Sequence, residues 1–520
     1  MFSTTPKDPV GKRFPSGWPV GLGLTLFYLL LSGFHLGSSD EEDLYLQTAR
    51  LGMSMERLAG FMPHPLTEQP TLPSAVYEPG LCAAAVPFYF LGRILECFGK
   101  PDQRVYLRRT PMVLPNLLLT AATSILLFRF CLLLGAERRH STIACLLFGL
   151  ATLAVPYSKT FFREPFAGFL ALLGGFCLVR YARLHNPNDL LLWISTIPLL
   201  AVTKLSVLVI LPGQLLYLAL PKECPVFPWE ERLALSHKIY LFFFIPACLA
   251  AAIFSAWKLR GPFPYAWLRS LFPDGSLGSW VQSCATRCLG LLFSWGKGLV
   301  WFSPPIVLSI IAWYRLCKQC RSEAILVLTV FVSLLLLYSL NPSWHGGACW
   351  GPRYLLPAIP WTLLPVAVWL RDGSWRLLLA GCFLLLGTTV QLAATAVYPQ
   401  HYLAAQLLAH PELRESLDPG PTHLEPIYWN AETAPLPGHF RTVFRWLTGG
   451  NRPSGPPCFN PTSASPNLLW SRFRQWDLWD YGWFHWTHGC RPDRIQSPSG
   501  PGTGSSAETK PAVLSYPREL

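Results

Sequence analysis

Four consecutive acidic residues, Asp40, Glu41, Glu42 and Asp43, stand in the stretch SSDEED, directly after the first long apolar run. A carboxylate in such a cluster can act as a general base toward a hydroxyl group or hold a divalent cation. Mutual repulsion should raise the pKa of some of the four. The alternative is a solvated helix start, because acidic residues are favourable near a helix N-terminus. The residues alone leave both interpretations open.

Further ionisable residues stand at the borders of apolar runs. Arg163 and Glu164 occur in SKTFFREP, and Lys204 separates two apolar runs in AVTKLSVLV. A charge at a membrane boundary can be a simple anchor, and a lysine can extend its ammonium group to the interface. Ionisable residues in or beside membrane spans are nevertheless costly, which makes them candidates for function. Glu164 would supply a second carboxylate, and Lys204 could bind an anionic headgroup.

Glycines frame the remaining polar candidates. Lys297 lies between two glycines in FSWGKGLVWFSPP, and His345 and Arg353 lie in WHGGACWGPRYLLP. Glycine lets the backbone approach a ligand closely, and lysine is a point-charge binder of phosphate. Tryptophans are expected at a membrane interface, so the two in the second stretch need no further explanation. That expectation does not account for the histidine, the glycine pair and the Gly-Pro-Arg together.

The composition indicates which elements must position these residues. Of 520 residues, 51% are hydrophobic and only 14% are charged, whereas a soluble protein is about one quarter charged. Several apolar runs approach the roughly 20 residues that cross a bilayer. We therefore predict an all-α polytopic membrane protein with about eleven spans. The predicted spans are 18–36, 110–134, 141–157, 163–182, 189–202, 203–220, 238–257, 298–315, 323–340, 353–370 and 376–397.

Charge placement predicts which loops share a side of the membrane. The net charge is +13, but much of it lies in short loops between apolar runs and no basic run of the kind that binds nucleic acid occurs. Residues 80–98 could be a span or an interfacial segment. If they do not cross and the N-terminus is cytoplasmic, the basic clusters between spans all fall inside; if they cross, all fall outside. We therefore predict that 80–98 is interfacial and that every candidate residue lies on the outer side.

The same pattern predicts the division of the chain. An apolar stripe from Leu44 to Met62 predicts an amphipathic helix along the outer membrane surface. The expected parts are a cytoplasmic N-terminus (1–17), a transmembrane domain (18–398) that includes a first outer loop (37–109), an extracytoplasmic Trp-rich segment (399–490) and a disordered tail (491–520).

Acids from two outer loops and cations from four other positions would thus meet at one face. Such a site suits a lipid-linked phosphate sugar, because cations would hold the phosphate and a carboxylate would deprotonate an acceptor hydroxyl. The lipid–phosphate–sugar bond would supply the energy. This agrees with the lack of a GxxxxGKS loop for ATP in the sequence.

Five stretches together resemble the type-C (GT-C) membrane glycosyltransferases, which use polyprenyl-phosphate sugars and include protein O-mannosyltransferases and the lipid A aminoarabinose transferase. The stretches are DEEDLYLQTARL, YEPGLCAAAVPFYFLGR, TFFREP, GLLFSWGKGLVWFSPP and the WHGGACWGPRYLLP hairpin, and the resemblance covers about 20–400. It is closest to an uncharacterised bacterial branch. It implies a GT-C-like helical bundle with outer-face amphipathic helices.

The resemblance also implies roles for individual residues. The catalytic base falls on Asp40 or Glu41, because four adjacent acids allow more than one register against the usual Asp-Glu pair. Glu164 matches the second acid of the branch. Phosphate or substrate contact is implied for Lys297, His345 and Arg353. The expected substrate-binding residues are Glu42, Asp43, Arg163, Glu164, Lys204, Lys297, His345 and Arg353.

The expected activity is transfer of a sugar from a polyprenyl-phosphate donor to a lipid, glycan or protein acceptor, by one displacement with inversion, at the outer face of a bacterial inner membrane. A divalent metal is compatible with this chemistry but not required by it. The alternatives are a transporter or flippase of a lipid-linked or anionic substrate, which usually shows repeated halves or broken helices, and a non-catalytic membrane assembly protein.

Overall fold

The computed structural model describes residues 17–58 (except 35 and 37), 77–99, 104–220, 277–397, 399, 402–403, 406 and 425–448. Over these residues the regular structure consists of helices alone, which confirms the all-α prediction. The predicted span at 238–257, most of the Trp-rich segment and the tail at 491–520 lie outside the described residues, as does most of the N-terminus.

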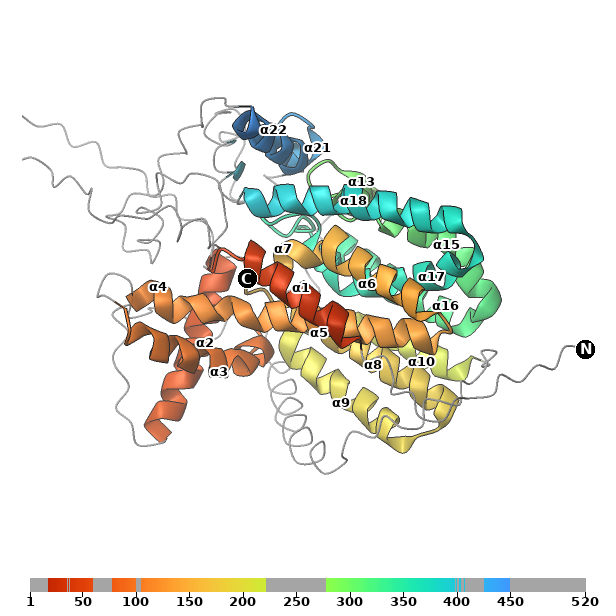
Figure 1. Ribbon diagram of the computed structural model, residues 1–520, viewed down its shortest axis with the longest axis horizontal. Helices are drawn as coiled ribbons and strands as arrows, with labels where there is room; N and C mark the ends of the chain where they lie inside the picture. Colours follow the sequence, from red (N-terminus) through yellow and green to blue (C-terminus); the bar gives the residue numbers. More distant parts are fainter. Residues whose placement is uncertain are drawn as a thin grey trace, which may run out of the picture.

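Figure 1 shows the order and arrangement of the described helices. In the first half they are α1 (Trp18–Leu31), α2 (Ser39–Leu58), α3 (Gly80–Glu96), α4 (Arg104–Arg109), η1 (Thr110–Val113), α5 (Leu114–Leu133), α6 (Arg138–Ala151), α7 (Ala154–Ser158), α8 (Glu164–Leu184), α9 (Pro187–Lys204), η2 (Leu205–Ile210) and α10 (Leu211–Ala219). In the second half they are α13 (Leu277–Phe293), α14 (Leu299–Phe302), α15 (Ile306–Gln319), α16 (Arg321–Leu340), η4 (Arg353–Ala358), α17 (Ile359–Trp369), η5 (Leu370–Asp372), α18 (Ser374–Ala396), α21 (Glu425–Trp429) and α22 (Pro435–Leu447).

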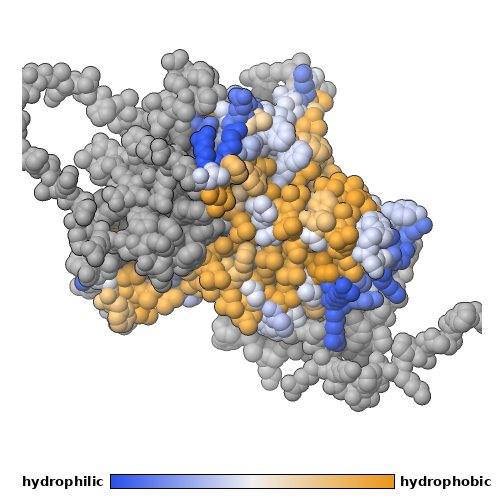
Figure 2. All heavy atoms as spheres, turned by 45° about the horizontal axis from the view of Figure 1, so that its top comes forward, coloured by the Kyte–Doolittle hydropathy of each residue, from blue (hydrophilic) through white to orange (hydrophobic). Residues whose placement is uncertain are grey.

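Six helical segments within the described ranges are long and apolar enough to cross a membrane. They are Arg104–Leu133, Glu164–Leu184, Pro187–Ala219, Arg321–Leu340, Arg353–Asp372 and Ser374–Ala396. The face brought forward in Figure 2 is mostly hydrophobic, with hydrophilic side chains gathered toward its edges. These features suggest a multi-pass membrane protein, while the predicted count of about eleven spans stays a prediction.

The segment Pro187–Ala219 contains a reversal of the chain rather than one straight helix. The Trp193 indole N–H donates to Gln214 Oε1 at 2.8 Å, although 21 helical residues would extend about 30 Å. Lys204, between the two residues, has an extended backbone (φ −160°, ψ 93°). The two halves therefore fold back on each other with Lys204 at the turn, and their separate crossing of the membrane, at 189–202 and 203–220, stays a prediction.

Buried charges hold the end of the bundle opposite this turn. The Arg183 guanidinium, which is 1% exposed, donates to Glu323 Oε1 at 2.9 Å. The Tyr217 hydroxyl donates to the same oxygen at 3.1 Å. Nearby, Arg180 pairs with Asp189 at 3.2 Å. The ends of α8 and α10 and the starts of α9 and α16 are thereby fixed at one level, which orients the other ends of these helices toward the candidate site.

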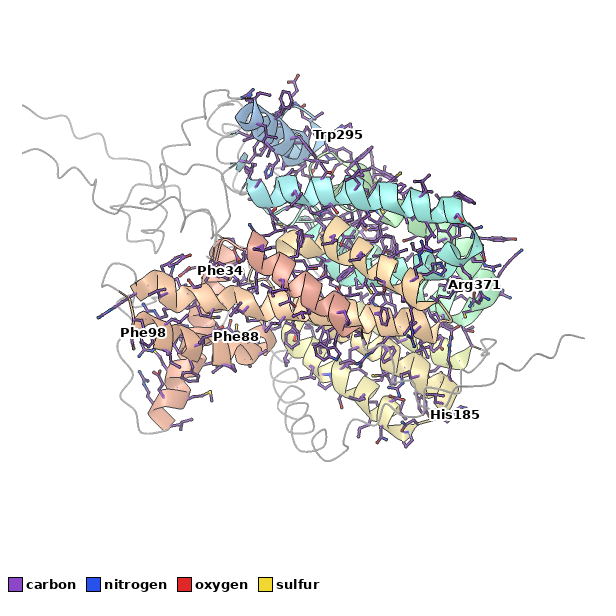
Figure 3. The ribbon with its side chains drawn as sticks, in the orientation of Figure 1. Phe34, Phe88, Phe98, His185, Trp295 and Arg371 are labelled. Carbon is purple, nitrogen blue, oxygen red and sulfur yellow. The ribbon has the colours of Figure 1, made fainter. Side chains whose placement is uncertain are left out.

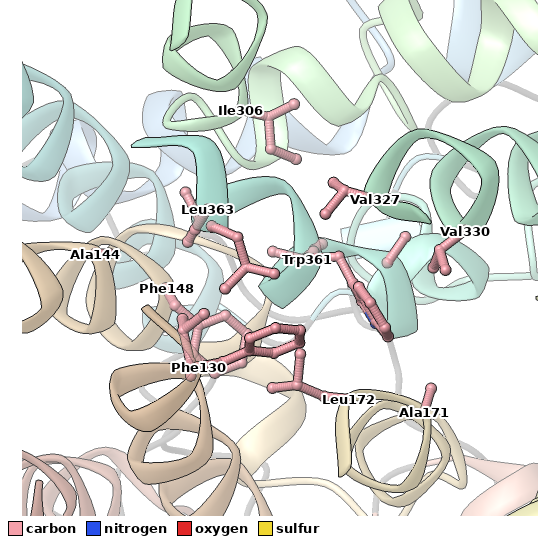
Figure 4. Close-up of a cluster of buried hydrophobic side chains, with 14 of the residues drawn as sticks. Phe130, Ala144, Phe148, Ala171, Leu172, Ile306, Val327, Val330, Trp361 and Leu363 are labelled. Carbon is pink, nitrogen blue, oxygen red and sulfur yellow. The ribbon is translucent and has the colours of Figure 1, made fainter. Parts of the chain in front are cut away.

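Aromatic and aliphatic side chains fill the middle of the bundle (Figure 4). The buried Trp361 ring of α17 meets Phe130 of α5 edge-on, with ring centroids 5.9 Å apart. Gly175 of α8 permits this packing, since a Cβ there would lie 1.9 Å from the Trp361 ring. Burying such rings contributes most of the packing energy of the layer, and α17 is correspondingly the most enclosed of the candidate spans.

The helices α2, α3 and α4 form an arm beside the bundle, at the left in Figure 1. On α2, Leu44 is buried, whereas Met55 and Leu58 near its end are exposed. The predicted amphipathic helix therefore exists, but its first half packs inside the protein. On α3, Leu81 and Tyr89 are buried, whereas Leu91 and Ile94, and Phe98 in the turn after the helix, are exposed. The interfacial position of 80–98 stays a prediction.

Candidate active site

Asp40, in the first turn of α2, is the most accessible of the carboxylates that meet at the end of the bundle near Lys204. Its Oδ2 accepts from Arg353 Nη1 at 2.7 Å, and its Oδ1 accepts from the Tyr77 hydroxyl at 2.8 Å. The side chain retains 31% exposure. Burial alone would raise the pKa of this carboxyl, but Arg353 and the other donors outweigh it and hold the pKa below its ordinary value. Asp40 is thus the partly exposed carboxylate of this group, and its lowered pKa favours the ionised form.

Glu41 is buried and is used to fix the start of α2. Its Oε2 accepts from the backbone N–H and the hydroxyl of Ser38, each at 3.0 Å, while the Glu41 N–H donates to Ser38 Oγ at 3.2 Å. This reciprocal arrangement is a capping box. Its Oε1 accepts from the Phe161 N–H at 2.7 Å. The two open assignments of the base therefore differ in the structure, because Glu41 positions α2 and Asp40 faces the cations.

The other two acids of the cluster lie further along the first turns of α2. Glu42 Oε1 pairs with Arg109 Nη2 at 2.6 Å, and the Arg109 guanidinium lies 5.1 Å from the Tyr45 ring centroid. Asp43 is half-buried. Glu42 therefore ties α2 to α4 within the arm, and substrate binding by Glu42 and Asp43 stays a prediction.

Glu164 and Lys204 form a buried ion pair that Arg353 links to Asp40. Lys204 Nζ donates to Glu164 Oε1 at 2.6 Å, and Arg353 Nε lies 3.8 Å from the same oxygen. The Glu164 side chain is only 3% exposed. Arg353 therefore bridges the accessible carboxylate and the buried one.

Aromatic rings enclose the cations of this cluster. Tyr338 and Tyr354 stack with centroids 4.6 Å apart. The Lys204 ammonium lies 4.7 Å from the Tyr354 ring, and the Arg353 guanidinium lies 5.0 Å from the Phe162 ring. Such rings attract a cation while excluding water from it, so the charges act on one another through a less polar medium than water.

The structure adds Glu78, which the sequence analysis did not select. It lies in the YEPG stretch just before α3, is buried, and forms an ion pair with Arg163. The Arg163 guanidinium also lies 4.5 Å from the Tyr77 ring. A signal was present in the sequence, since Glu78, like Glu164, is a lone acid that directly precedes an apolar run. Three acids and three cations thus meet here, namely Asp40, Glu78, Glu164, Arg163, Lys204 and Arg353, and we call them the ionic cluster.

Lys297 is fully buried and holds the hairpin that carries Arg353. Its ammonium donates to the carbonyls of Gly347 at 2.8 Å and Cys349 at 2.6 Å, and it lies 4.7 Å from the Tyr428 ring. Burial lowers the pKa of Lys297 to about 8, which Cys349 offsets only in part. Its ammonium is therefore committed to backbone carbonyls, and the predicted contact with phosphate competes with this structural role.

His345 is likewise turned into the hairpin. Its Nδ1 accepts from the Gly347 N–H at 2.9 Å, and its ring lies 5.3 Å from that of Tyr428. Gly346, at φ +68°, would place a Cβ 3.0 Å from Arg353 Nε, so the turn needs glycine both for its backbone and for the approach of Arg353. His345 helps to shape the turn that sets the Arg353 position, and its contact with substrate stays a prediction.

The described residues contain no group of three or more histidine, cysteine or acidic side chains placed to hold a metal ion. Each carboxylate of the ionic cluster is instead within 4 Å of a cationic side chain. Comparison with protein-family models gave no match, and a search of curated proteins gave none either.

Replacing Glu41 with glutamine should destabilise the protein more than it slows any reaction. The amide nitrogen would face Ser38 or Phe161 donors and leave one of them unpaired, which costs about 1–3 kcal/mol. Thermal unfolding of purified protein would show a lower Tm, with Glu41→Asp, which keeps the charge but shortens the side chain, as the comparison. An unchanged Tm together with complete loss of turnover would instead make Glu41 the base.

Proposed function

We propose that this protein is an integral-membrane glycosyltransferase that moves a sugar from a polyprenyl-phosphate donor to an acceptor hydroxyl. The observation that carries the proposal is the partly exposed Asp40 carboxylate, held 2.7 Å from Arg353 at the edge of a buried cluster of cations. The likeness of the sequence motifs to GT-C enzymes supports the same chemistry. A base next to phosphate-binding cations is the minimum that this transfer requires.

In the proposed reaction Asp40 takes the proton of the acceptor hydroxyl. The acceptor oxygen forms a bond to the anomeric carbon from the face opposite the phosphate, and the bond from that carbon to the phosphate oxygen breaks. The bonding electrons pass to that oxygen, so a phosphodiester with one negative charge becomes a monoester with two. The products are the glycosylated acceptor and polyprenyl phosphate, with inversion at the anomeric carbon, and the proton leaves Asp40 to solvent.

In this proposal Arg353 binds the phosphate, because its planar guanidinium can donate to two phosphate oxygens as negative charge develops on them. Arg163 and Lys204 would add positive charge behind it, since both belong to the ionic cluster. Phosphate binding would compete with Asp40 for Arg353. That competition would release the carboxylate and raise its pKa toward that of a better base at the moment when donor is present.

The proposed setting is the inner membrane of a bacterium, with the N-terminus cytoplasmic, the C-terminus extracytoplasmic and the ionic cluster at the outer face. The positive-inside distribution of arginine and lysine supports this orientation. At the end opposite the ionic cluster lie Arg180 and Arg183, in agreement with a cytoplasmic position for that end.

The deciding experiment is an assay of polyprenyl-phosphate release by the purified protein. A panel of polyprenyl-phosphate sugars is supplied with crude envelope extract as acceptor, and heat-treated protein is the control. Release from at least one donor, dependent on acceptor, is expected. Saturable donor binding without release, or vesicle-to-vesicle donor movement without bond cleavage, would contradict the proposal and favour a transporter of lipid-linked sugars.

A further inference from the structure

The short helix α22 (Pro435–Leu447) lies outside the ionic cluster and is held to the bundle by one face. Leu436 and His439 on this face are buried. The His439 Nδ1 lies 3.2 Å from the Ala393 carbonyl near the end of α18, and its ring packs against Trp350 with centroids 4.5 Å apart. Burial lowers the pKa of His439 to about 3. The imidazole is therefore neutral and acts as a fixed anchor.

A second face of α22 is apolar and exposed. Phe440, Phe444 and Leu447 are 36%, 67% and 73% exposed. Their spacing of four and three residues places them on one side of the helix. Arg441 and Arg445 are exposed on a third face, next to the apolar one, and the Arg441 guanidinium also donates to the Glu432 carbonyl. The helix therefore has a docked face, an apolar face and a basic face, and only the first is explained by packing against α18.

The helix α22 lies at one end of the candidate membrane span α18. It packs against the last turns of α18, a candidate membrane span whose Leu385, Leu386 and Leu392 are exposed. Exposed tryptophans gather at the same end. Trp295 lies beside α21 and α22 in Figure 3. Its ring stacks on that of Trp301 with centroids 5.2 Å apart, and the neighbouring Gly296 N–H donates to the Tyr428 carbonyl of α21. Tryptophans of this kind concentrate at membrane–water interfaces.

We propose that α22 lies in the interface of the bilayer at the end of α18, with its apolar face among the acyl chains and its two arginines on the phosphates of anionic lipids. An apolar face beside a basic face is the pattern of interfacial helices that bind anionic membranes. Both α22 and the candidate span α18 carry exposed apolar side chains, and the two helices are in contact at His439 and Ala393, so the acyl chains around α18 would lie next to α22. The site is thus a lipid-headgroup contact separate from the ionic cluster, and it does not depend on the proposed transferase activity.

Photo-crosslinking of the full chain in lipid nanodiscs tests the position of α22. Phe444→p-benzoylphenylalanine is compared with Ala431→p-benzoylphenylalanine, an exposed position in the turn before the helix. Mass spectrometry should find lipid adducts at 444 and few at 431. Adducts of 444 with other parts of the chain, equal lipid yields at both positions, or no adduct at 444 would each overturn the proposal.

The lipid preference is tested with nanodiscs that contain equal amounts of phosphatidylglycerol and phosphatidylcholine. Phosphatidylglycerol should be enriched between about fivefold and about 25-fold among the adducts at 444, because each of the two arginines near an anionic surface contributes about fivefold. The enrichment should fall to the bulk ratio in Arg441→Gln/Arg445→Gln protein, while the total yield of lipid adduct remains. An enrichment that persists in the double variant would show that the two arginines do not select anionic lipid and would contradict this part of the proposal. An unchanged gel-filtration profile would show that the variant is folded.

Discussion

Asp40→Asn should reduce turnover by about 10²–10⁴-fold, the usual contribution of a general base, while the affinity for a polyprenyl-phosphate donor stays within a few fold. The asparagine keeps the shape of the side chain and can still contact Arg353 and Tyr77, but it cannot accept a proton from an acceptor hydroxyl. Turnover is measured as polyprenyl-phosphate release under saturating donor, and affinity by equilibrium binding of the donor.

The pH dependence provides a second readout of the same residue. Because the pKa of Asp40 in the free protein is below its ordinary value, kcat/KM should show no acid limb between about pH 5 and pH 7. A carboxyl group with a lowered pKa stays ionised until the pH falls through that pKa, so the activity should be lost only in more acidic solution. Full activity of Asp40→Asn at every pH would exclude Asp40 as the base.

The matched control is Glu42→Gln, which removes one negative charge two residues away. Glu42 pairs with Arg109 in the arm and stands outside the ionic cluster, so its loss should reduce turnover much less than Asp40→Asn does. Equal losses in both variants would mean that the charge of the first turn of α2, rather than a particular base, supports the activity.

The sequence predicted the membrane class, most of the long helices and most of the charged side chains that form the ionic cluster. Apolar runs and isolated charged residues can be recognised before the fold is known. It could not distinguish Asp40 from Glu41. That distinction depends on which carboxylate faces Ser38 and Phe161 and which faces Arg353, and Phe161 is 120 residues away from Glu41 along the chain.

The hairpin shows a different limit of sequence reasoning. Lys297 and His345 carry the residue types of a phosphate site, yet the structure places both against backbone groups of the hairpin. A lysine between glycines is equally suited to bind carbonyls or phosphate, since it has three donors and no fixed geometry. Glu78 was missed because a lone acid before an apolar run is a weak signal by itself, and its ion pair with Arg163 forms only in the folded chain.

Arg353→Ala should reduce kcat/KM by about 10²–10³-fold, because truncating one member of a buried, hydrogen-bonded charge pair costs about 2–5 kcal/mol. Arg353 Nη1 lies 2.7 Å from Asp40 Oδ2, and Arg353 Nε lies 3.8 Å from Glu164 Oε1. Loss of the guanidinium should therefore affect both the binding of the polyprenyl-phosphate sugar and the proposed base. Arg353→Lys keeps the charge but not the planar fork and should recover only part of the loss. Steady-state kinetics and donor binding separate the two effects.

The pH profile of Arg353→Ala then shows whether Arg353 acts on Asp40 and the phosphate or only stabilises the fold. Without Arg353, burial still raises the pKa of Asp40 while its main opposing charge is gone. The acid limb of kcat/KM should therefore move to higher pH than in the parent protein. A variant that lost stability alone would keep the original profile at reduced amplitude.

Combining Asp40→Asn with Arg353→Ala tests whether the two residues act as a unit. If Arg353 both binds the phosphate and controls the proton affinity of Asp40, the double variant should be little slower than the slower single variant, because groups that act together are not additive. A multiplicative loss would show independent roles and would contradict the exchange of Arg353 between Asp40 and the donor phosphate. The Glu42→Gln/Arg353→Ala pair serves as the additive reference, since Glu42 contacts Arg109 in the arm instead.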